Sequence, residues 1–310
     1  MKKFLLFILK FSGFALAVYF ILLIVCGSVL PLYLRKNLNY RIGAYGHMHS
    51  RMKDIKQVKD VDLVILGSSH AYRGFDTRIF ESRGIRAFNL GSSSQTPIQT
   101  LMLLEKYLDQ LHPKLVLIEV YPEIFGFDGV ESSLEIVANE KIDYHVLKMV
   151  FKINHIKTYN STIYSLFRQT FGLDNGFLQH DKDKRDLYIS GTGFVSRDMD
   201  YFKNISHEPT SWNFNSKQLK AFDQVLEMLK NRNIECVLVQ APFTNSLYNS
   251  KINNHYADSF FTSKSRYINF NTRLSLNDSL HFYDADHLNQ DGVILFNEAV
   301  LDWLKNEKLI

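Results

Sequence analysis

Short runs of apolar residues alternate with longer amphipathic stretches through most of the chain. The short runs are rich in β-branched residues, as expected for buried strands, and span residues 61–66, 85–90, 115–120, 236–239 and 267–270. Helical spacing is found at residues 97–111, 216–231 and 290–308. Because strands and helices alternate, we expect a flavodoxin-like three-layer α/β/α sandwich with a parallel sheet of about five strands.

One long stretch, residues 125–212, does not follow this rhythm. It is rich in Asn, Asp, Tyr and Phe and has no clear apolar run of period two. We interpret it as an insertion in a domain that spans residues 61–308. Such an insertion either covers a site at the carboxyl ends of the strands or is a helical packing element with irregular loops, and the sequence leaves both readings open.

The amino end carries a longer apolar run. Residues 11–34 have no charged side chain, and a helix of this length, at about 1.5 Å per residue, covers a hydrocarbon core roughly 30 Å thick. We therefore expect residues 1–34 to form a transmembrane anchor and the polar residues 35–60 to form a juxtamembrane connector. The length and bulk of the run disfavour a cleaved signal peptide, and Val25 disfavours lipidation of Cys26. Basic residues flank both ends, so charge alone does not orient the helix.

Composition excludes several classes of protein. A chain of 310 residues with 46% hydrophobic content can bury one substantial core. Its 36 basic and 32 acidic residues leave a net charge of +4 with no dense basic block, which argues against a nucleic-acid partner. The only cysteines, Cys26 and Cys236, cannot build a disulfide framework or a cysteine metal site.

Two short motifs carry the candidate chemistry. Gly-Ser-Ser at 67–69 ends the first predicted strand, and Asp-Ala-Asp-His at 284–287 follows the last one. A serine becomes a good nucleophile when an imidazole takes its proton, and the imidazole needs a carboxylate to fix its tautomer and stabilise its charged form. Ser69, His287 and Asp284 could supply this set.

Together with Gly91 after the second strand, these motifs resemble those of the SGNH, or GDSL-type, hydrolases and acyltransferases. The resemblance covers roughly residues 61–307, without much of the insertion. It implies that Ser69 is the nucleophile, that Asp284 and His287 complete the triad, and that the backbone N–H groups of Ser69 and Gly91 hold the oxyanion. It implies no metal or other cofactor.

The sequence departs from the family's pattern in two places. Ser68 stands where an Asp usually precedes the nucleophile, and residues 119–123 replace the Gly-x-Asn-Asp motif, so the oxyanion asparagine is missing. Ser92, Tyr121 or a residue of the insertion could donate in its place. We expect Ser92, Tyr121 and His70 to contribute to substrate binding, with His70 at the rim of the site.

The anchor narrows the resemblance to membrane-anchored bacterial SGNH proteins of the cell envelope. These act outside the cytoplasmic membrane on envelope polymers, often beside a membrane-bound O-acyltransferase. The resemblance thus implies an extracytoplasmic domain that transfers or hydrolyses acyl groups, commonly O-acetyl, on a polysaccharide. Two alternatives stay open: an inactive SGNH-like scaffold that binds polysaccharide or an acyltransferase partner, and a metal-dependent hydrolase built on His281, Asp284, Asp286 and His287.

Overall fold

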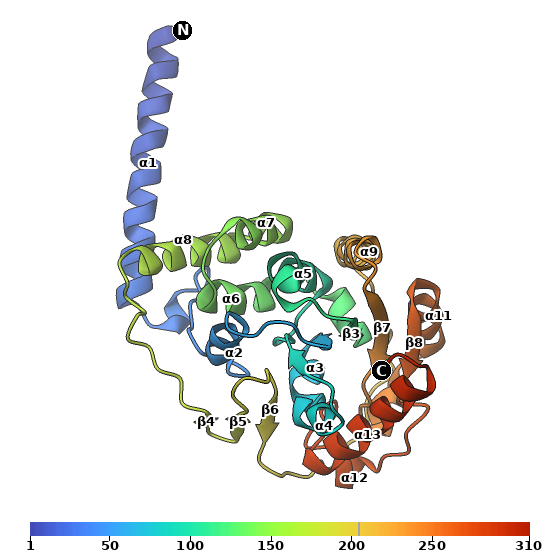
Figure 1. Ribbon diagram of the computed structural model, residues 1–310. Helices are drawn as coiled ribbons and strands as arrows, with labels where there is room; N and C mark the ends of the chain where they lie inside the picture. Colours follow the sequence, from blue (N-terminus) through green and yellow to red (C-terminus); the bar gives the residue numbers. More distant parts are fainter. Residues whose placement is uncertain (204) are drawn as a thin grey trace.

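A five-stranded, entirely parallel sheet forms the centre of the computed structural model, which describes residues 1–203 and 205–310 (Figure 1). Its strands are β1 (Leu63–Leu66), β2 (Ala87–Asn89), β3 (Leu115–Glu119), β7 (Glu235–Gln240) and β8 (Arg266–Asn269). They lie in the order β2-β1-β3-β7-β8, so the direction of winding reverses next to β1, where α/β sheets place their sites. The five predicted strands and the flavodoxin-like order are confirmed.

Helices cover both faces of the sheet. One face carries α5 (Pro97–Leu111), α9 (Ser216–Asn231) and α11 (Asn254–Lys264); the other carries α3 (Ser69–Gly74), α4 (Thr77–Ser82) and α13 (Gln290–Asn306). The short α10 (Asn245–Ser250) and α12 (Asp278–His281) lie in the loops after β7 and β8. In β1, Val64 and Leu66 join the first core, while Leu63 and Ile65 join the second. Alternate residues of a strand point to opposite faces, so a continuous apolar run fills both cores.

The segment expected to be a connector is part of the domain. After a 3₁₀ turn at Leu32–Leu34, the chain forms α2 (Met48–Ile55), and Met48, Met52 and Ile55 are completely buried in the core beneath α5. Arg51 on the same helix is also buried, where it donates to the carbonyl of Gly91. The expected connector of residues 35–60 is therefore wrong for this part, because three apolar side chains at helical spacing have a core to enter.

The insertion has two halves with different roles. The 3₁₀ turn η2 (Pro122–Gly126) leads into its first half, which contains the helices α6 (Val130–Asn139), α7 (Tyr144–Ile153) and α8 (Ile156–Thr170), and these helices pack near α2 and α5. Its second half is a small antiparallel sheet of β4 (Lys182–Asp183), β5 (Asp186–Tyr188) and β6 (Val195–Arg197), which contacts α3. Helical packing therefore describes the first half, whereas the second half reaches the helix that begins at Ser69.

The amino end forms one long helix, α1 (Lys2–Val29), that projects from the domain (Figure 1). An 18-residue window of α1 has a mean hydropathy of 2.4, so this helix is long and apolar enough to cross a membrane. Its last part packs on α8. There the Tyr19 hydroxyl donates to Asn160 Oδ1 over 2.5 Å, and a Cβ at Gly27 would lie 2.5 Å from the Tyr164 ring.

Candidate active site

The turn after β1 presents two adjacent serines at the carboxyl edge of the sheet. Gly67 has φ +143°, and a Cβ there would lie 2.7 Å from the Cβ of Glu119, so only glycine fits. Ser68 is the N-cap of α3, and its Oγ accepts a hydrogen bond from the His70 N–H. Because Ser68 takes the capping role, the Ser69 hydroxyl is left free for the site.

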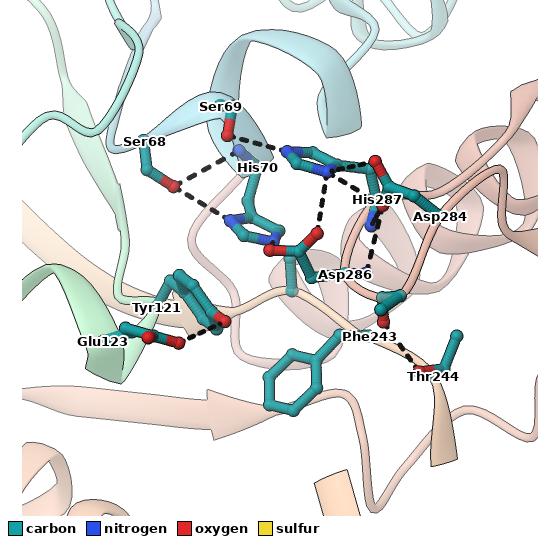
Figure 2. Close-up of polar contacts among 12 residues, drawn as sticks. Ser68, Ser69, His70, Tyr121, Glu123, Phe243, Thr244, Asp284, Asp286 and His287 are labelled. Atoms are coloured by element: carbon teal, nitrogen blue, oxygen red, sulfur yellow. Dashed lines mark hydrogen bonds and ion pairs between the residues drawn. The ribbon is translucent and has the colours of Figure 1, made fainter. Parts of the chain in front are cut away.

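The structure brings together the three residues predicted to form a triad (Figure 2). Ser69 Oγ lies 2.7 Å from His287 Nε2. On the other side of the ring, His287 Nδ1 lies 3.0 Å and 3.1 Å from the two carboxylate oxygens of Asp284. This is the geometry in which imidazole takes a serine proton and a carboxylate fixes the tautomer. The catalytic roles themselves remain a prediction.

Hydrogen bonds hold the loop that carries the acid and the base. Asp284 Oδ1 accepts the backbone N–H groups of Asp286 and His287 at 3.1 Å and 2.8 Å. The backbone N–H and the hydroxyl of Thr244, which follows β7, both donate to the Ala285 carbonyl. The loop is therefore fixed from within and from the neighbouring strand end, which limits the motion of the imidazole.

A second carboxylate, Asp286, also reaches the base, although its spacing in the sequence suggested only a metal ligand. Its Oδ1 lies 3.0 Å from His287 Nδ1. Burial lowers the pKa of His287, but the charge of Asp286 and hydrogen bonds to both carboxylates outweigh burial and raise it to about 9. For the acid Asp286, burial acts in the opposite direction and raises the pKa. The nearby charge of His287 outweighs burial and holds the pKa of Asp286 well below its usual range. The imidazolium and Asp286 thus stabilise each other.

His70 lies behind His287 rather than at the rim of the site, so the expected placement is wrong. The two rings stack with centroids 4.7 Å apart and planes 5° apart, and His70 is buried. Its Nδ1 lies 3.0 Å from Ser68 Oγ, and its Nε2 lies 3.8 Å from Asp286 Oδ2. Burial, followed by the charge of His287, lowers the pKa of His70 to about 4, so this ring is neutral near pH 7.

Glu119, the last residue of β3, lies beneath the serine turn. Ser68 Oγ donates to Glu119 Oε2 over 3.1 Å. Glu119 is buried, with only 1% of its surface exposed to solvent. Burial raises the pKa of Glu119 to about 8. The only sequence signal for this group was a charged residue at the end of an otherwise apolar strand.

The oxyanion arrangement differs from the expected one. Ser69 N–H lies at the first position of α3 and has no acceptor among residues 1–203 and 205–310, so it is free to donate. Gly91 N–H, in contrast, donates to Asn89 Oδ1 over 3.0 Å. The expected oxyanion role of Gly91 is therefore not supported, because its N–H closes a turn with the Asn89 side chain. The lack of a Cβ at Gly91 instead lets α3 pack closely, since a Cβ would lie 2.8 Å from that of Ala71.

The remaining predicted binding residues lie beneath the surface of the site. Ser92 is fully buried and hydrogen-bonds to Gln95 and Ser132, so its expected contact with substrate is wrong. Tyr121 is buried too, and its hydroxyl donates to Glu123 over 2.9 Å. The Tyr121 ring lies 4.3 Å from the His70 ring, so Tyr121 supports that histidine instead of lining a cleft.

An aromatic and cationic wall flanks the other face of the base. Tyr283 stacks on His287 with centroids 5.4 Å apart, and the Arg197 guanidinium lies 4.5 Å above the Tyr283 ring. Arg73 of α3 forms two hydrogen bonds to Asp186 of β5. Arg73, Asp186 and Arg197 also line a polar pocket of about 300 Å³ together with Tyr72, and Ser69, Asp284 and His287 are not part of its lining.

The acid and histidine cluster has the spacing of a metal site, but His287 has no free ring nitrogen to offer a metal. Ligand atoms of His70, Asp286 and His287 lie within 4.8 Å of one another. However, both ring nitrogens of His287 are engaged, one by Ser69 and the other by carboxylates. His281, which the metal hypothesis also used, accepts the Asn277 N–H through its Nδ1. The geometry therefore favours a proton-transfer site over a metal centre.

The fold and the site together define an α/β protein with a serine, histidine and aspartate triad arranged as the SGNH resemblance implies. No family model matches the sequence, and no curated protein matches it. Solved structures with a similar fold include a GDSL-like lipase of Bacteroides thetaiotaomicron, with 10% identity, 84% of this chain and 98% of that chain covered, and a TM-score of 0.42. A psychrotrophic esterase of Pseudoalteromonas has 14% identity, coverage of 80% and 100%, and a TM-score of 0.36. These values are too low to indicate an activity, so activity has to be inferred from the site.

Proposed function

We propose that the chain is a membrane-anchored serine esterase or O-acyltransferase that works through an acyl-Ser69 intermediate. The observation that carries this proposal is the 2.7 Å contact between Ser69 Oγ and His287 Nε2, with carboxylates at the opposite nitrogen. A hydrogen-bonded serine and imidazole with an orienting acid is the arrangement that activates a hydroxyl for acyl transfer.

The reaction follows from these contacts. Neutral His287 takes the hydroxyl proton as Ser69 Oγ attacks the ester carbonyl, and Asp284 and Asp286 stabilise the resulting imidazolium. Ser69 N–H donates to the oxyanion. Collapse of the tetrahedral intermediate breaks the ester bond, and the departing alcohol takes the proton from His287. Water or a sugar hydroxyl, deprotonated by His287, then attacks the acyl carbon and releases Ser69.

We further propose that the substrate is an acylated envelope polysaccharide, with O-acetyl as the acyl group. The polar pocket at Arg73 and Arg197, which Tyr45 and Tyr72 also line, supports a glycan, because sugars are bound by hydrogen bonds and ring stacking. The apolar helix α1 supports attachment to the cytoplasmic membrane. In this proposal the domain lies outside that membrane, where a membrane-bound O-acyltransferase would be its natural partner.

Labelling with a fluorophosphonate tests the proposal. Full-length protein in detergent is expected to be labelled, Ser69→Ala and His287→Ala are expected to lose labelling, and Asp284→Ala is expected to react slowly. Ser68→Ala is the matched control, because Ser68 is adjacent in sequence but caps α3. Equal labelling of wild type and Ser69→Ala would overturn the proposal.

A second candidate is an inactive SGNH-like scaffold that binds polysaccharide or an acyltransferase partner. The oxyanion arrangement favours it, since the Gly91 N–H is already used and the family's asparagine is missing. Loss of one oxyanion donor costs roughly 10² to 10³ in rate. A scaffold would bind polysaccharide but show no fluorophosphonate labelling in any variant.

A further inference from the structure

The length of the uncharged part of α1 fixes where a membrane must lie along it. Residues 11–29 carry no charge and extend for about 28 Å, close to the roughly 30 Å of a hydrocarbon core. A segment nearer the amino end, residues 2–19, has the same length but places Lys10 at its centre. A lysine at the middle of a bilayer is costly. The membrane segment therefore lies after Lys10.

The same stretch of α1 is also the part that packs on the domain. Tyr19 donates to Asn160 of α8, and Gly27 lies against the ring of Tyr164, one helical turn further along α8. The two contact residues, Tyr19 and Gly27, are eight residues apart, or about 12 Å along the helix. Since α8 packs directly on the helix that enters the bilayer, the amino end of α8 lies beside the membrane.

The outer surface around this contact is apolar, as a lipid environment requires. Helix α7 buries Val146, Met149, Val150 and Ile153 in the core, yet its opposite side is also apolar. Tyr144 and Phe151 on α7 are 72% and 67% exposed, and Leu147, which lies between them on this helix, is 38% exposed. Ile156 at the start of α8 is 50% exposed. A helix that is apolar on both sides lies against a second apolar phase.

Basic residues accompany this surface. Lys152 on α7 donates to the neutral Gln224 Oε1 over 2.8 Å. Neither Lys152 nor Lys157 on α8 has a carboxylate within ion-pair distance in the described part of the chain, while the nearby Lys148 is paired with Glu105. Apolar side chains with unpaired lysines beside them are typical of interfacial helices that bind anionic lipid. Helices α7 and α8 also lie on the side of the domain from which α1 rises (Figure 1).

We propose that Tyr144, Leu147, Phe151 and Ile156 form a membrane-docking surface that inserts into the headgroup and acyl boundary of the bilayer that carries α1. This inference rests on the anchoring role in the proposed function. Anionic headgroups bind Lys152 and Lys157. Docking by α1 and by α7–α8 holds the domain at two places, so its height and orientation are fixed. The loop of Asp284 and His287 joins α12 to α13, and both helices lie on the side of the domain away from α1 (Figure 1).

Depth-dependent quenching tests the docking surface. Full-length Tyr144→Trp is reconstituted in phosphatidylcholine and phosphatidylglycerol vesicles, with and without doxyl-labelled lipid. Tyr201→Trp is the matched control, because Tyr201 is 53% exposed and lies near the end of α12, where the Phe202 N–H donates to the Phe282 carbonyl. Signal from Trp212 and Trp303 is subtracted with the wild-type protein. We expect doxyl lipid to quench the fluorescence of Tyr144→Trp at least twofold and to leave that of Tyr201→Trp unchanged. Aqueous iodide should instead quench Tyr201→Trp and leave Tyr144→Trp unchanged.

The outcomes separate this inference from the anchor and from the chemistry. Iodide quenching of Tyr144→Trp without doxyl quenching, in protein that resists carbonate extraction, would overturn the docking surface, because the surface would then face water. Protection from both quenchers would also overturn it and indicate that a second copy of the chain covers the surface. Release of the wild-type protein by carbonate would remove the anchor and this inference with it. Fluorophosphonate labelling of Ser69 reports on the proposed chemistry independently of both.

Discussion

Two buried histidines lie face to face in the site, and their surroundings give them opposite protonation. The His70 and His287 rings are 4.7 Å apart and nearly parallel, yet the pKa of His70 is lowered to about 4 and that of His287 is raised to about 9. Burial lowers both values. The difference comes from the carboxylates, because Nδ1 of His287 faces Asp284 and Asp286 at hydrogen-bond distance, whereas Nδ1 of His70 faces a hydroxyl.

This contrast explains how a second imidazole is tolerated beside the base. A charged His70 would repel the His287 imidazolium that forms during catalysis. Kept neutral, it serves as a flat packing surface behind the base, with Tyr121 behind it in turn. Contact with carboxylates, and not closeness to Ser69 in the sequence, therefore decides which histidine can act as the base.

Removal of each ring in turn should give the largest difference. His287→Ala is expected to lower the rate of fluorophosphonate labelling by about 10³-fold or more, because the serine loses its base. His70→Ala is expected to lower it by about tenfold or less, through poorer packing behind His287. Thermal unfolding of both variants controls for loss of fold. Equal losses in two folded variants would show that His70 takes part in the chemistry.

The pH dependence of labelling should reveal the raised pKa of the base. With a pKa of about 9, only a small fraction of His287 is neutral at pH 7. The neutral fraction, and with it the rate, should rise about fiftyfold between pH 7 and pH 9 and then level off. The rise follows the loss of a proton from the imidazolium, so its sign is positive with pH. A rate that is flat from pH 7 to pH 9 would contradict the assigned charge of His287.

The two carboxylates can be compared by isosteric substitution. Asp286→Asn removes the charge that raises the pKa of His287 most, so the midpoint of the pH profile should fall by about one unit or more. The plateau rate of labelling should fall about tenfold, because the His287 imidazolium loses one stabilising carboxylate. Asp284→Asn leaves Asp286 in place and should keep the midpoint above pH 7.

The double variant completes this test. If the two carboxylates share one role, the loss in Asp284→Asn with Asp286→Asn should exceed the product of the single losses. An unchanged midpoint in Asp286→Asn would instead show that Asp284 alone sets the charge of the base. Both readings come from the same labelling assay across pH.

The sequence predicted the regular parts of the fold well because their patterns are local. Helices α5 and α9 begin and end at the predicted residues, since apolar periodicity and a first-turn proline mark them. The burial of helix α2 in the domain was not predicted, because Arg51, a charged residue, lies in its buried face. What holds Arg51 there is a distant carbonyl and the ring of Tyr72, and neither is visible in a local pattern.

The site was predicted only in part, because local patterns identify its triad but not the residues that reach it through tertiary contacts. The order of Ser69, Asp284 and His287 relative to the strands identified the triad, because parallel strands end at one edge. The partners that set the charges came from tertiary packing. Asp286 and Glu119 become important through contacts of 3.0 Å and 3.1 Å with residues on other elements or across a turn, which spacing does not encode.

The smallest expected effect concerns Glu119, whose carboxyl group is linked to the neutral His70 through the Ser68 hydroxyl. In the folded protein the pKa of Glu119 is about 8, against 4.5 for the ordinary group, so the folded state binds a proton more tightly than the unfolded state. This stability is complete below pH 4.5 and is lost as pH rises through about 8. Glu119→Gln keeps the shape without the titrating proton. We therefore expect Tm to fall less between pH 6 and pH 9 in Glu119→Gln than in wild type, by about 3 °C.

Glu135→Gln is the matched control for this measurement. Glu135 is also buried, and burial raises its pKa to about 8 as well, but it accepts from the Ser93 N–H instead of from Ser68. Both variants should flatten the loss of Tm with pH, whereas only Glu119→Gln should alter labelling, by less than about threefold, because only Glu119 reaches His70 through the Ser68 hydroxyl. A pH dependence of Tm identical to wild type in Glu119→Gln would show that Glu119 is ionised in the folded protein. In that case a negative charge would lie two hydrogen bonds from His70, and its neutrality would need another cause.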